Sequence, residues 1–221
     1  MATAISEQRV ARMAVRRQAT IEEALDAAEQ IVAECGAGAV TVAEIARQMG
    51  MRPPSVYKYF PSLHGVYDAL FARGNARMAS YVDDVVRDLD PGLDRLLEAT
   101  RAIMRWGMLN RGLATLLFWR PIPGFEPSPA SYAVAQRLVD RSRTDLTVAV
   151  AQGELAPHAD SDEVFRLFTA ISAGLCSQQL ANQPDATYES GLFTSLTDRA
   201  LDMFVRQHAP PPGEERQWGK S

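Results

Sequence analysis

The stretch that most constrains the fold is TVAEIARQMGMRPPSVYKYF, residues 41–60. It predicts two short helices joined by a tight turn. Thr41 and Glu44 have the spacing of a capping box, in which the hydroxyl caps the first turn and the carboxylate reaches back to the backbone N–H of the cap. Gly50 stands where the first helix should end, because glycine tolerates the left-handed conformation of a C-terminal cap. Pro53 fits the first position of the second helix, where its missing N–H costs nothing.

A helix, a glycine-containing turn and a second helix form the geometry that places the second helix in the major groove of DNA. Here the second helix starts with small residues, which allow a close approach to base edges, and continues with phenols and an ammonium group that can reach phosphates. Val56 and Phe60 are expected to pack inward. An ordinary αα-hairpin with an aromatic-rich corner has the same spacing. The expected DNA-contacting residues are Thr41, Arg52, Ser55, Tyr57, Lys58 and Tyr59.

The same stretch resembles the DNA-binding segment of TetR/AcrR-type transcriptional regulators. A Thr-Val start, an Ile-Ala pair, a Gly turn and a Tyr-x-Tyr-Phe ending occur in the same order, and the resemblance covers about residues 20–70. It implies an all-α protein with an N-terminal three-helix head that contains the helix-turn-helix. A larger helical bundle that binds a small molecule and forms a homodimer would follow the head. The implied function is a regulator, a repressor that a small and largely apolar molecule releases from a palindromic DNA operator.

Two positions depart from the family pattern. Leu63 stands where the family usually has a lysine that would contact a phosphate. Glu22 and Glu23 occupy the region where the family tends to place an arginine, and the arginines of this chain lie further back, at Arg16 and Arg17. The first departure removes one expected contact with the DNA backbone.

The charge is distributed unevenly along the chain. The formal net charge is −4 and the sequence pI is about 5.5, which argues against a protein that coats nucleic acid without specificity. Residues 1–20 nevertheless have a balance of +3, and residues 45–60 also have a balance of +3. This asymmetry is typical of a small DNA-contacting end on a larger acidic body. Residues 1–15 taken alone fit a solvated, arginine-rich tail.

Other classes of site find little support in the residue pattern. His64, His158 and His208 are isolated from other ligand types at metal-binding spacing, so no metal is expected. Without a glycine-rich phosphate loop or a nucleophile signature, no catalytic residue and no cofactor are expected. An all-α enzyme and a helical adaptor that binds protein remain the alternative functions. Cys35 and Cys176 are expected to be buried thiols.

The chain lacks the signals of a membrane or secreted protein. No run approaches the ~18 apolar residues of a membrane span. The arginines near the N-terminus are not followed by the apolar block of a secretory signal. We therefore expect a soluble, cytoplasmic protein without a membrane partner.

Apolar periodicity of three to four residues predicts helices along most of the chain, and no segment alternates as a strand does. The expected helices are 17–35, 62–89, 93–109, 113–119, 131–152, 161–181 and 187–207, with a Pro-rich loop at 120–129. The expected domains are a flexible N-terminal arm at 1–15, the DNA-binding domain at 16–61, the helical ligand-binding and dimerisation domain at 62–208, and a flexible tail at 209–221.

The resemblance also implies a ligand cavity and a dimer surface in the larger domain. A single aromatic residue at helical spacing is more often a core residue than part of a pocket wall. The candidate ligand-binding residues are Trp106, Phe118, Trp119, Arg120, Phe125, Tyr132, His158, Phe168 and Gln178. The last two expected helices carry the candidate dimer interface, which comprises Phe168, Ile171, Gly174, Leu175, Leu192, Leu196 and Met203.

Overall fold

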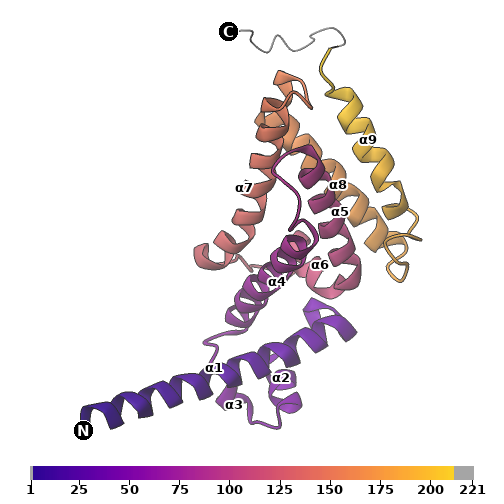
Figure 1. Ribbon diagram of the computed structural model, residues 1–221. Helices are drawn as coiled ribbons and strands as arrows, with labels where there is room; N and C mark the ends of the chain where they lie inside the picture. The colour runs from indigo at the N-terminus through magenta and orange to yellow at the C-terminus, as the bar shows by residue number, and fades with distance from the viewer. Residues whose placement is uncertain (1, 212–221) are drawn as a thin grey trace. The chain divides into compact units, whose positions relative to one another are not determined.

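The computed structural model describes residues 2–211, with side chains from residue 8 onward. Within this range all regular structure is helical (Figure 1), which confirms the predicted all-α class. The α-helices are α1 (Ala2–Cys35), α2 (Val42–Gln48), α3 (Pro53–Val56), α4 (Leu63–Val85), α5 (Leu93–Leu109), α6 (Arg111–Trp119), α7 (Pro129–Ala151), α8 (Asp162–Asn182) and α9 (Thr197–Gln207). Short 3₁₀ turns are η1 (Ala37–Ala39), η2 (Pro157–Ala159) and η3 (Thr194–Leu196).

The chain divides into two compact units. The first unit contains residues 1–76 and 110–135, and the second contains residues 77–109 and 136–221. The helix-turn-helix pair α2–α3 thus shares the first unit with α1 and α6. The predicted domain boundaries at residues 15, 61 and 208 stay predictions, and residues 212–221 of the expected flexible tail lie outside the described range.

Helix α1 begins at Ala2, earlier than the expected start near residue 17, so the expected flexible arm is helical over residues 2–15. The predicted apolar stripe of this helix is buried from Ala24 to Val32. The Tyr67 hydroxyl of α4 reaches η1 and donates a hydrogen bond to the Ala37 carbonyl at 2.7 Å. Burial raises the pKa of Tyr67, so this phenol remains a donor at neutral pH.

Two glycines let helices of the first unit approach each other closely. A Cβ at Gly74 would lie 2.8 Å from Cδ1 of Leu117, so this position of α4 is a packing site for α6. A Cβ at Gly112 would lie 2.6 Å from the Val32 carbonyl oxygen, where α6 meets α1. Helix α4 is continuous through Gly74 and ends at Val85, before the expected end at residue 89.

The Pro-rich segment between α6 and α7 is a loop, as predicted, and it is fastened to α4. The Ser128 backbone N–H and hydroxyl both donate to the Asp68 carboxylate, at 2.7 and 2.9 Å. The buried Phe125 ring packs against Tyr67 and Phe71, with ring centroids 5.8 and 6.5 Å apart. These contacts make the loop part of the core of the first unit.

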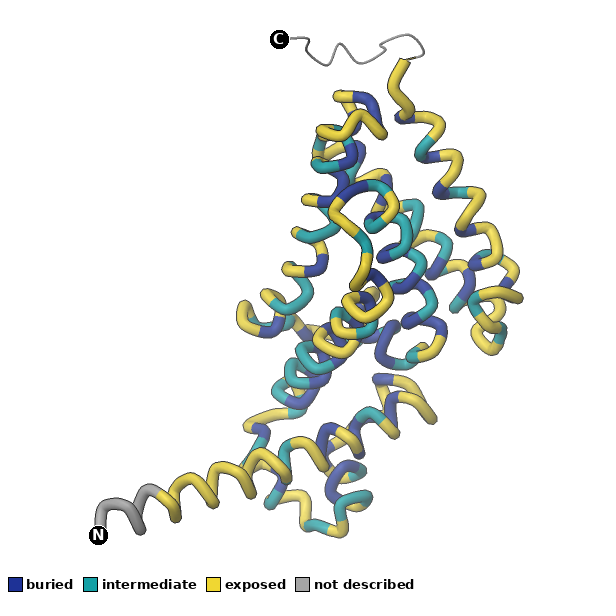
Figure 2. Tube along the Cα trace, in the orientation of Figure 1, coloured by how far each residue is buried: buried dark blue, intermediate teal, exposed yellow. Residues whose placement is uncertain are grey.

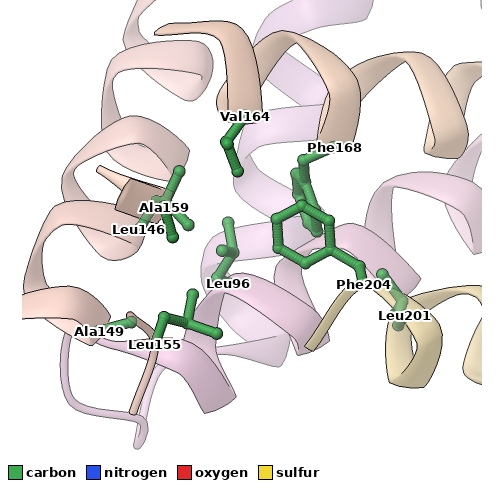
Figure 3. Packing of buried hydrophobic residues seen from close by; sticks show 9 residues of the cluster. All are labelled: Leu96, Leu146, Ala149, Leu155, Ala159, Val164, Phe168, Leu201 and Phe204. Atoms are coloured by element: carbon green, nitrogen blue, oxygen red, sulfur yellow. The ribbon is translucent and has the colours of Figure 1, made fainter. Parts of the chain in front are cut away.

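The second unit is built around a buried apolar cluster drawn from four helices and the turn at η2 (Figure 3). Phe168 of α8 and Phe204 of α9 meet edge to face, with ring centroids 4.9 Å apart. Beside the cluster, the buried Asp145 carboxylate accepts hydrogen bonds from the Arg95 guanidinium at 2.8 and 2.5 Å. The buried cluster consists of Leu96, Leu146, Ala149, Leu155, Ala159, Val164, Phe168, Leu201 and Phe204.

The last helix is shorter than predicted, because α9 begins at Thr197, after turns at residues 188–190 and 192–193 and the short η3. The buried Gln179 of α8 explains the difference: its side-chain oxygen accepts from the backbone N–H groups of Phe193 and Thr194, at 2.8 and 3.3 Å. Gly191 packs so closely on this amide that a Cβ there would lie 2.5 Å from the Gln179 oxygen. The backbone is therefore held in a turn by a side chain from a different helix.

The burial of one cysteine differs from the expectation. Cys176 is buried as predicted, and burial raises the pKa of its thiol to about 11, whereas Cys35 is exposed. Tyr132 and Val139 of α7 are exposed although both have large apolar side chains. Among the residues that the structure describes, no helix has the length and apolar character needed to cross a membrane. In the same part of the chain, no cluster of His, Cys, Asp and Glu is placed to hold a metal.

Candidate nucleic-acid interface

The turn between α2 and α3 follows from local sequence. The Thr41 hydroxyl accepts from the Glu44 backbone N–H at 3.1 Å, which is the predicted N-terminal cap. The other half of the capping box differs, since the Glu44 carboxylate accepts from the Arg47 guanidinium at 2.9 and 2.6 Å. Gly50 has a φ of 64°, the left-handed conformation expected of it, and the Met51 N–H then closes the helix on the Ala46 carbonyl at 2.8 Å.

Helix α3 starts at Pro53 as predicted, after Arg52 in an extended conformation. Val56 and Phe60 are buried and anchor α3 to the first unit, which confirms their inward packing. Arg52, Tyr57 and Lys58 are exposed, so a phenol and two cations project from the same short helix and its ends. Such a surface can offer hydrogen bonds to bases and positive charge to phosphates.

The other residues that were expected to contact DNA are less accessible. Ser55 and Tyr59 are half-buried, and Thr41 is exposed although its hydroxyl already accepts the cap hydrogen bond. A hydroxyl has one donor and two acceptor sites, so the Thr41 donor stays available to a phosphate oxygen.

Arg17 holds the C-terminal end of α3, a contact that was not expected from the sequence. Its Nη1 donates to the Lys58 carbonyl at 2.9 Å, and its guanidinium carbon lies 5.3 Å from the centre of the Tyr59 ring. This places a cation at the C-terminal end of α3, where carbonyls lack helical partners. One feature of the sequence indicates this contact. Arg17 stands four residues before Ile21, so it lies on the same face of α1 as the apolar stripe.

The candidate ligand residues of the first unit lie on or after α6. Phe118 and Trp119 are 37% and 40% exposed and contact each other edge to face. Arg120 is exposed and caps α6 with a left-handed φ of 45°. Phe125 lies in the core of this unit, so its apolar ring has a packing role there. Tyr132, on α7, is exposed.

The candidate ligand residues of the second unit are mostly engaged in its own packing. Trp106 and Phe168 are buried, and Phe168 belongs to the central cluster, so it is not available as a dimer surface. His158 lies 2.9 Å from His208, measured between Nε2 and Nδ1. Gln178 is exposed, whereas its neighbour Gln179, which the sequence analysis passed over, is the buried residue.

The other candidate dimer residues lie at or near the surface of the second unit. Gly174, Leu192, Leu196 and Met203 are exposed, and a Cβ at Gly174 would meet nothing within 4 Å. Ile171 and Leu175 are half-buried. Leu192 lies in the turn before α9 rather than on a helix.

Comparison with known proteins agrees with this geometry. The family described as "Bacterial regulatory proteins, tetR family" matches residues 24–70. The match begins in the buried part of α1, includes α2 and α3, and ends in the first half of α4. The DNA-binding region of this chain, residues 24–70, is of the TetR type.

Curated relatives of this chain have the names of transcriptional regulators. "HTH-type transcriptional regulator Rv1816" of Mycobacterium tuberculosis is 28% identical over 123 residues, which is 54% of this chain and 53% of the relative. "HTH-type transcriptional repressor BdcR" of Escherichia coli is 29% identical over 113 residues, 51% of this chain and 57% of the relative. The chain thus spans about half the length of the curated relatives it matches.

The fold of the described chain also has solved counterparts. The "transcriptional regulator FadR from Bacillus subtilis in complex with stearoyl-CoA" superposes with a TM-score of 0.65 at 15% identity. The superposition covers 83% of this chain and 97% of that one. At this identity the likeness establishes the fold alone.

Proposed function

We propose that this protein is a DNA-binding transcriptional regulator that acts as a repressor and is released from a palindromic operator by a small, largely apolar molecule. The observation that carries the proposal is the helix-turn-helix itself. Gly50 sets the turn, Val56 and Phe60 anchor α3, and Tyr57 and Lys58 project outward. The matches to tetR-family regulators and to a repressor in Escherichia coli support the same conclusion.

The proposed DNA contacts are of two kinds, contacts to bases and contacts to phosphates. Ser55 and Tyr57 would lie nearest the bases, since they are on α3 itself or at its end. Lys58 and Tyr59 would bind phosphates, with Thr41 at the start of α2, and Arg52 could serve either role. A single head of this size contacts few base pairs, so two heads related by a two-fold axis would bind a palindrome.

The response to a ligand is proposed to act through the first unit. Phe118 and Trp119 on α6 are exposed aromatic rings, and Arg120 adds a cation beside them. Helix α6 packs on α1 through Gly112, and α4 follows α3 directly in the chain. A molecule held at α6 could therefore alter the position of the helices that brace α3. The structural neighbour crystallised with stearoyl-CoA, whose stearoyl chain is apolar, supports an effector with an apolar part.

Release requires differential binding. Shifting the population from 1:99 to 99:1 requires a ligand that binds the released state about 5.5 kcal/mol more tightly. Operator DNA must then weaken ligand binding by the same factor by which ligand weakens DNA binding. Titration of each affinity with and without the other partner tests this, and a compound with equal affinity for free and DNA-bound protein is not the effector.

The experiment that tests DNA binding is selection of bound duplexes from a random pool, followed by titration of the selected site at several salt concentrations. Lys58→Ala should weaken binding to all sequences and lower the salt slope by about 0.9 per protomer, because one phosphate contact is lost. Arg87→Ala is the matched control, since Arg87 is an exposed cation of the second unit paired with Asp84. Failure to select any sequence would refute the proposed function, and an unchanged slope for Lys58→Ala would refute this docking of α3.

A further inference from the structure

The N-terminal part of α1 carries a row of arginines that has no role in the contacts proposed above. Arg9, Arg12 and Arg16 are spaced by three and four residues, so they lie on one face of the helix. All three are exposed, as Figure 2 shows for this end of α1. The chain has no acidic residue between Glu7 and Glu22. Among residues 8–211, the structure pairs none of the three arginines with a carboxylate.

The direction of this row is fixed by the residue that follows it. Arg17 holds the C-terminal end of α3 through the Lys58 carbonyl and the Tyr59 ring. Since α1 is continuous from Ala2 to Cys35, the row cannot turn independently of that contact. Successive residues are about 100° apart, so Arg16 lies roughly a quarter-turn around the helix from Arg17. The row is thus set on the flank of α1, in a defined position relative to α3.

We propose that Arg9, Arg12 and Arg16 form a second DNA-binding surface, which binds the phosphates of the duplex flanking the bases contacted by α3. In Figure 1 this part of α1 extends past the α2–α3 pair. At about 1.5 Å per residue, Arg9 and Arg16 lie roughly 10 Å apart along the helix. One DNA strand presents about three phosphates over that length, at ~3.4 Å of axial rise each. Three guanidinium groups on one rigid face match that spacing and charge.

Phosphate is the partner that the charge of this surface favours. A second copy of the chain would bring one arginine row against another, and like charges disfavour such an interface. The exposed Val10 and Met13 beside the row form too small an apolar face to offset this repulsion. The net charge of −4 means that the chain as a whole is repelled by DNA. A local row of cations offsets this repulsion at the DNA-binding end.

The experiment combines protein variants with duplexes of two lengths, and it rests on the proposed function because the site must first be selected by the wild-type protein. One duplex contains the selected site alone, and the other adds about one helical turn, roughly ten base pairs, at each end. The triple variant R9A/R12A/R16A is compared with the wild type at several salt concentrations. On the long duplex we expect the triple variant to bind about tenfold more weakly or worse at moderate salt, with a salt slope lower by about 2.7 per protomer. On the short duplex the two proteins should bind alike.

Two control variants separate charge from position. R9K/R12K/R16K keeps the positive charge and should retain most of the salt slope on the long duplex. Insertion of two alanines between Arg16 and Arg17 keeps the charge and the contact with α3 but turns the row by about 200°. The insertion variant should behave as the triple alanine variant. Circular dichroism of each variant checks that the helical content is retained.

The outcomes distinguish this inference from the proposed function. If the wild-type protein selects no sequence, the proposed function fails. If Lys58→Ala weakens binding as expected while the triple variant keeps the wild-type slope on the long duplex, only the arginine row is refuted. A loss of equal size on both duplexes also refutes the row as a contact to flanking DNA. A triple variant with changed mass in sedimentation and unchanged DNA binding would overturn the proposal in favour of a protein partner.

Discussion

At the scale of single residues, Gln179 determines where the last helix begins. Its amide oxygen accepts two backbone N–H groups at the start of η3, and its Nε2 donates to the Gln183 carbonyl at 2.7 Å. Gln179→Leu should lower the free energy of unfolding by about 2–3 kcal/mol, because buried backbone donors lose their acceptor. Urea denaturation measures the loss.

The neighbouring residue supplies the control for that measurement. Gln178 is exposed, and its side chain contacts only the Asn182 amide at 3.1 Å among the hydrogen bonds that the structure describes. Gln178→Leu should change the free energy of unfolding by no more than about 0.5 kcal/mol. Equal losses for the two variants would contradict the role assigned to Gln179.

His208 makes the stability of the protein depend on pH. Burial lowers the pKa of His208, and the charge of the adjacent His158 lowers it further. The unfolded chain therefore takes up the proton more readily, so the free energy of unfolding falls as pH drops below the ordinary histidine value of 6.5. Above the ordinary histidine pKa of 6.5, His208 no longer lowers the free energy of unfolding.

Urea midpoints at about pH 7.5 and pH 5.5 test this sign. The wild-type midpoint should be lower at the acidic pH, and His208→Gln should reduce the difference. This window lies above the range in which Asp160 titrates, since the Arg143 guanidinium and the Thr147 hydroxyl hold the pKa of that carboxyl below its usual value. A variant with the full wild-type difference would show that another group causes it.

At the scale of helices, the sequence predicted those whose ends are set by local signals. The bounds of α5 are the expected ones, at Leu93 and Leu109, because its apolar stripe is regular and it follows a Pro-Gly pair. Ser161 caps α8 by accepting from the Val164 N–H at 3.3 Å, at the position where this helix was expected to start. In α2 and α3, the special residues Thr41, Gly50 and Pro53 likewise act within a few residues of themselves.

Helix ends set by distant partners or by helix propagation were missed. The start of α9 depends on Gln179, which no pattern within residues 187–207 encodes. The start of α1 was placed too late because residues 2–16 lack an apolar stripe. Once the packed part of a helix has formed, each added residue with good helix propensity costs little, and Ala, Arg, Met and Gln are such residues.

In the candidate site, too, features set by local sequence were predicted and a contact between distant residues was missed. The helix-turn-helix, with exposed Tyr57 and Lys58, followed from a local motif, whereas the support from Arg17 spans 41 positions in sequence and could not be inferred from one. The aromatic residues gave the weakest predictions. Phe125 and Phe118 look alike in the sequence, yet Phe125 is buried against α4 and Phe118 is exposed, because tertiary packing decides which rings are enclosed.

The packing of α6 on α1 leads to a prediction at this scale. Gly112→Val should destabilise the first unit by about 1–3 kcal/mol, because the added carbons would overlap the Val32 backbone and side chain. Gly38→Ala is the control, since a Cβ there meets nothing within 4 Å, and it should be nearly neutral. Thermal unfolding compares the two. A neutral Gly112→Val would mean that α6 and α1 can separate without cost.

At the scale of the whole molecule, the proposed homodimer leads to a test of mass. Leu196 and Met203 are exposed on the second unit, so replacing either with glutamate should leave the protomer folded. If these residues form the dimer interface, Leu196→Glu or Met203→Glu should convert the dimer to monomer at micromolar concentration, because a buried unpaired charge is costly at an interface. Sedimentation equilibrium measures the mass.

The control for assembly is Leu109→Glu, which changes another exposed leucine of the second unit and should leave the mass unchanged. A wild-type monomer, or a dimer that survives both glutamate variants, would contradict the proposed interface. The same preparations titrated with the selected duplex would reveal whether loss of the dimer also abolishes binding to a palindrome.

The contact between Arg17 and α3 has a consequence for how such a protein can diverge. Arg17 hydrogen-bonds the backbone carbonyl of residue 58 rather than its side chain, so the support persists whatever amino acid occupies that position. The exposed side chains of α3 can then be exchanged through mutation without loss of the brace that orients the helix. If α3 binds DNA as proposed, single substitutions of exposed side chains would change the DNA sequence that is bound, while Arg17, Tyr59, Val56 and Phe60 would be retained because they hold the helix in place.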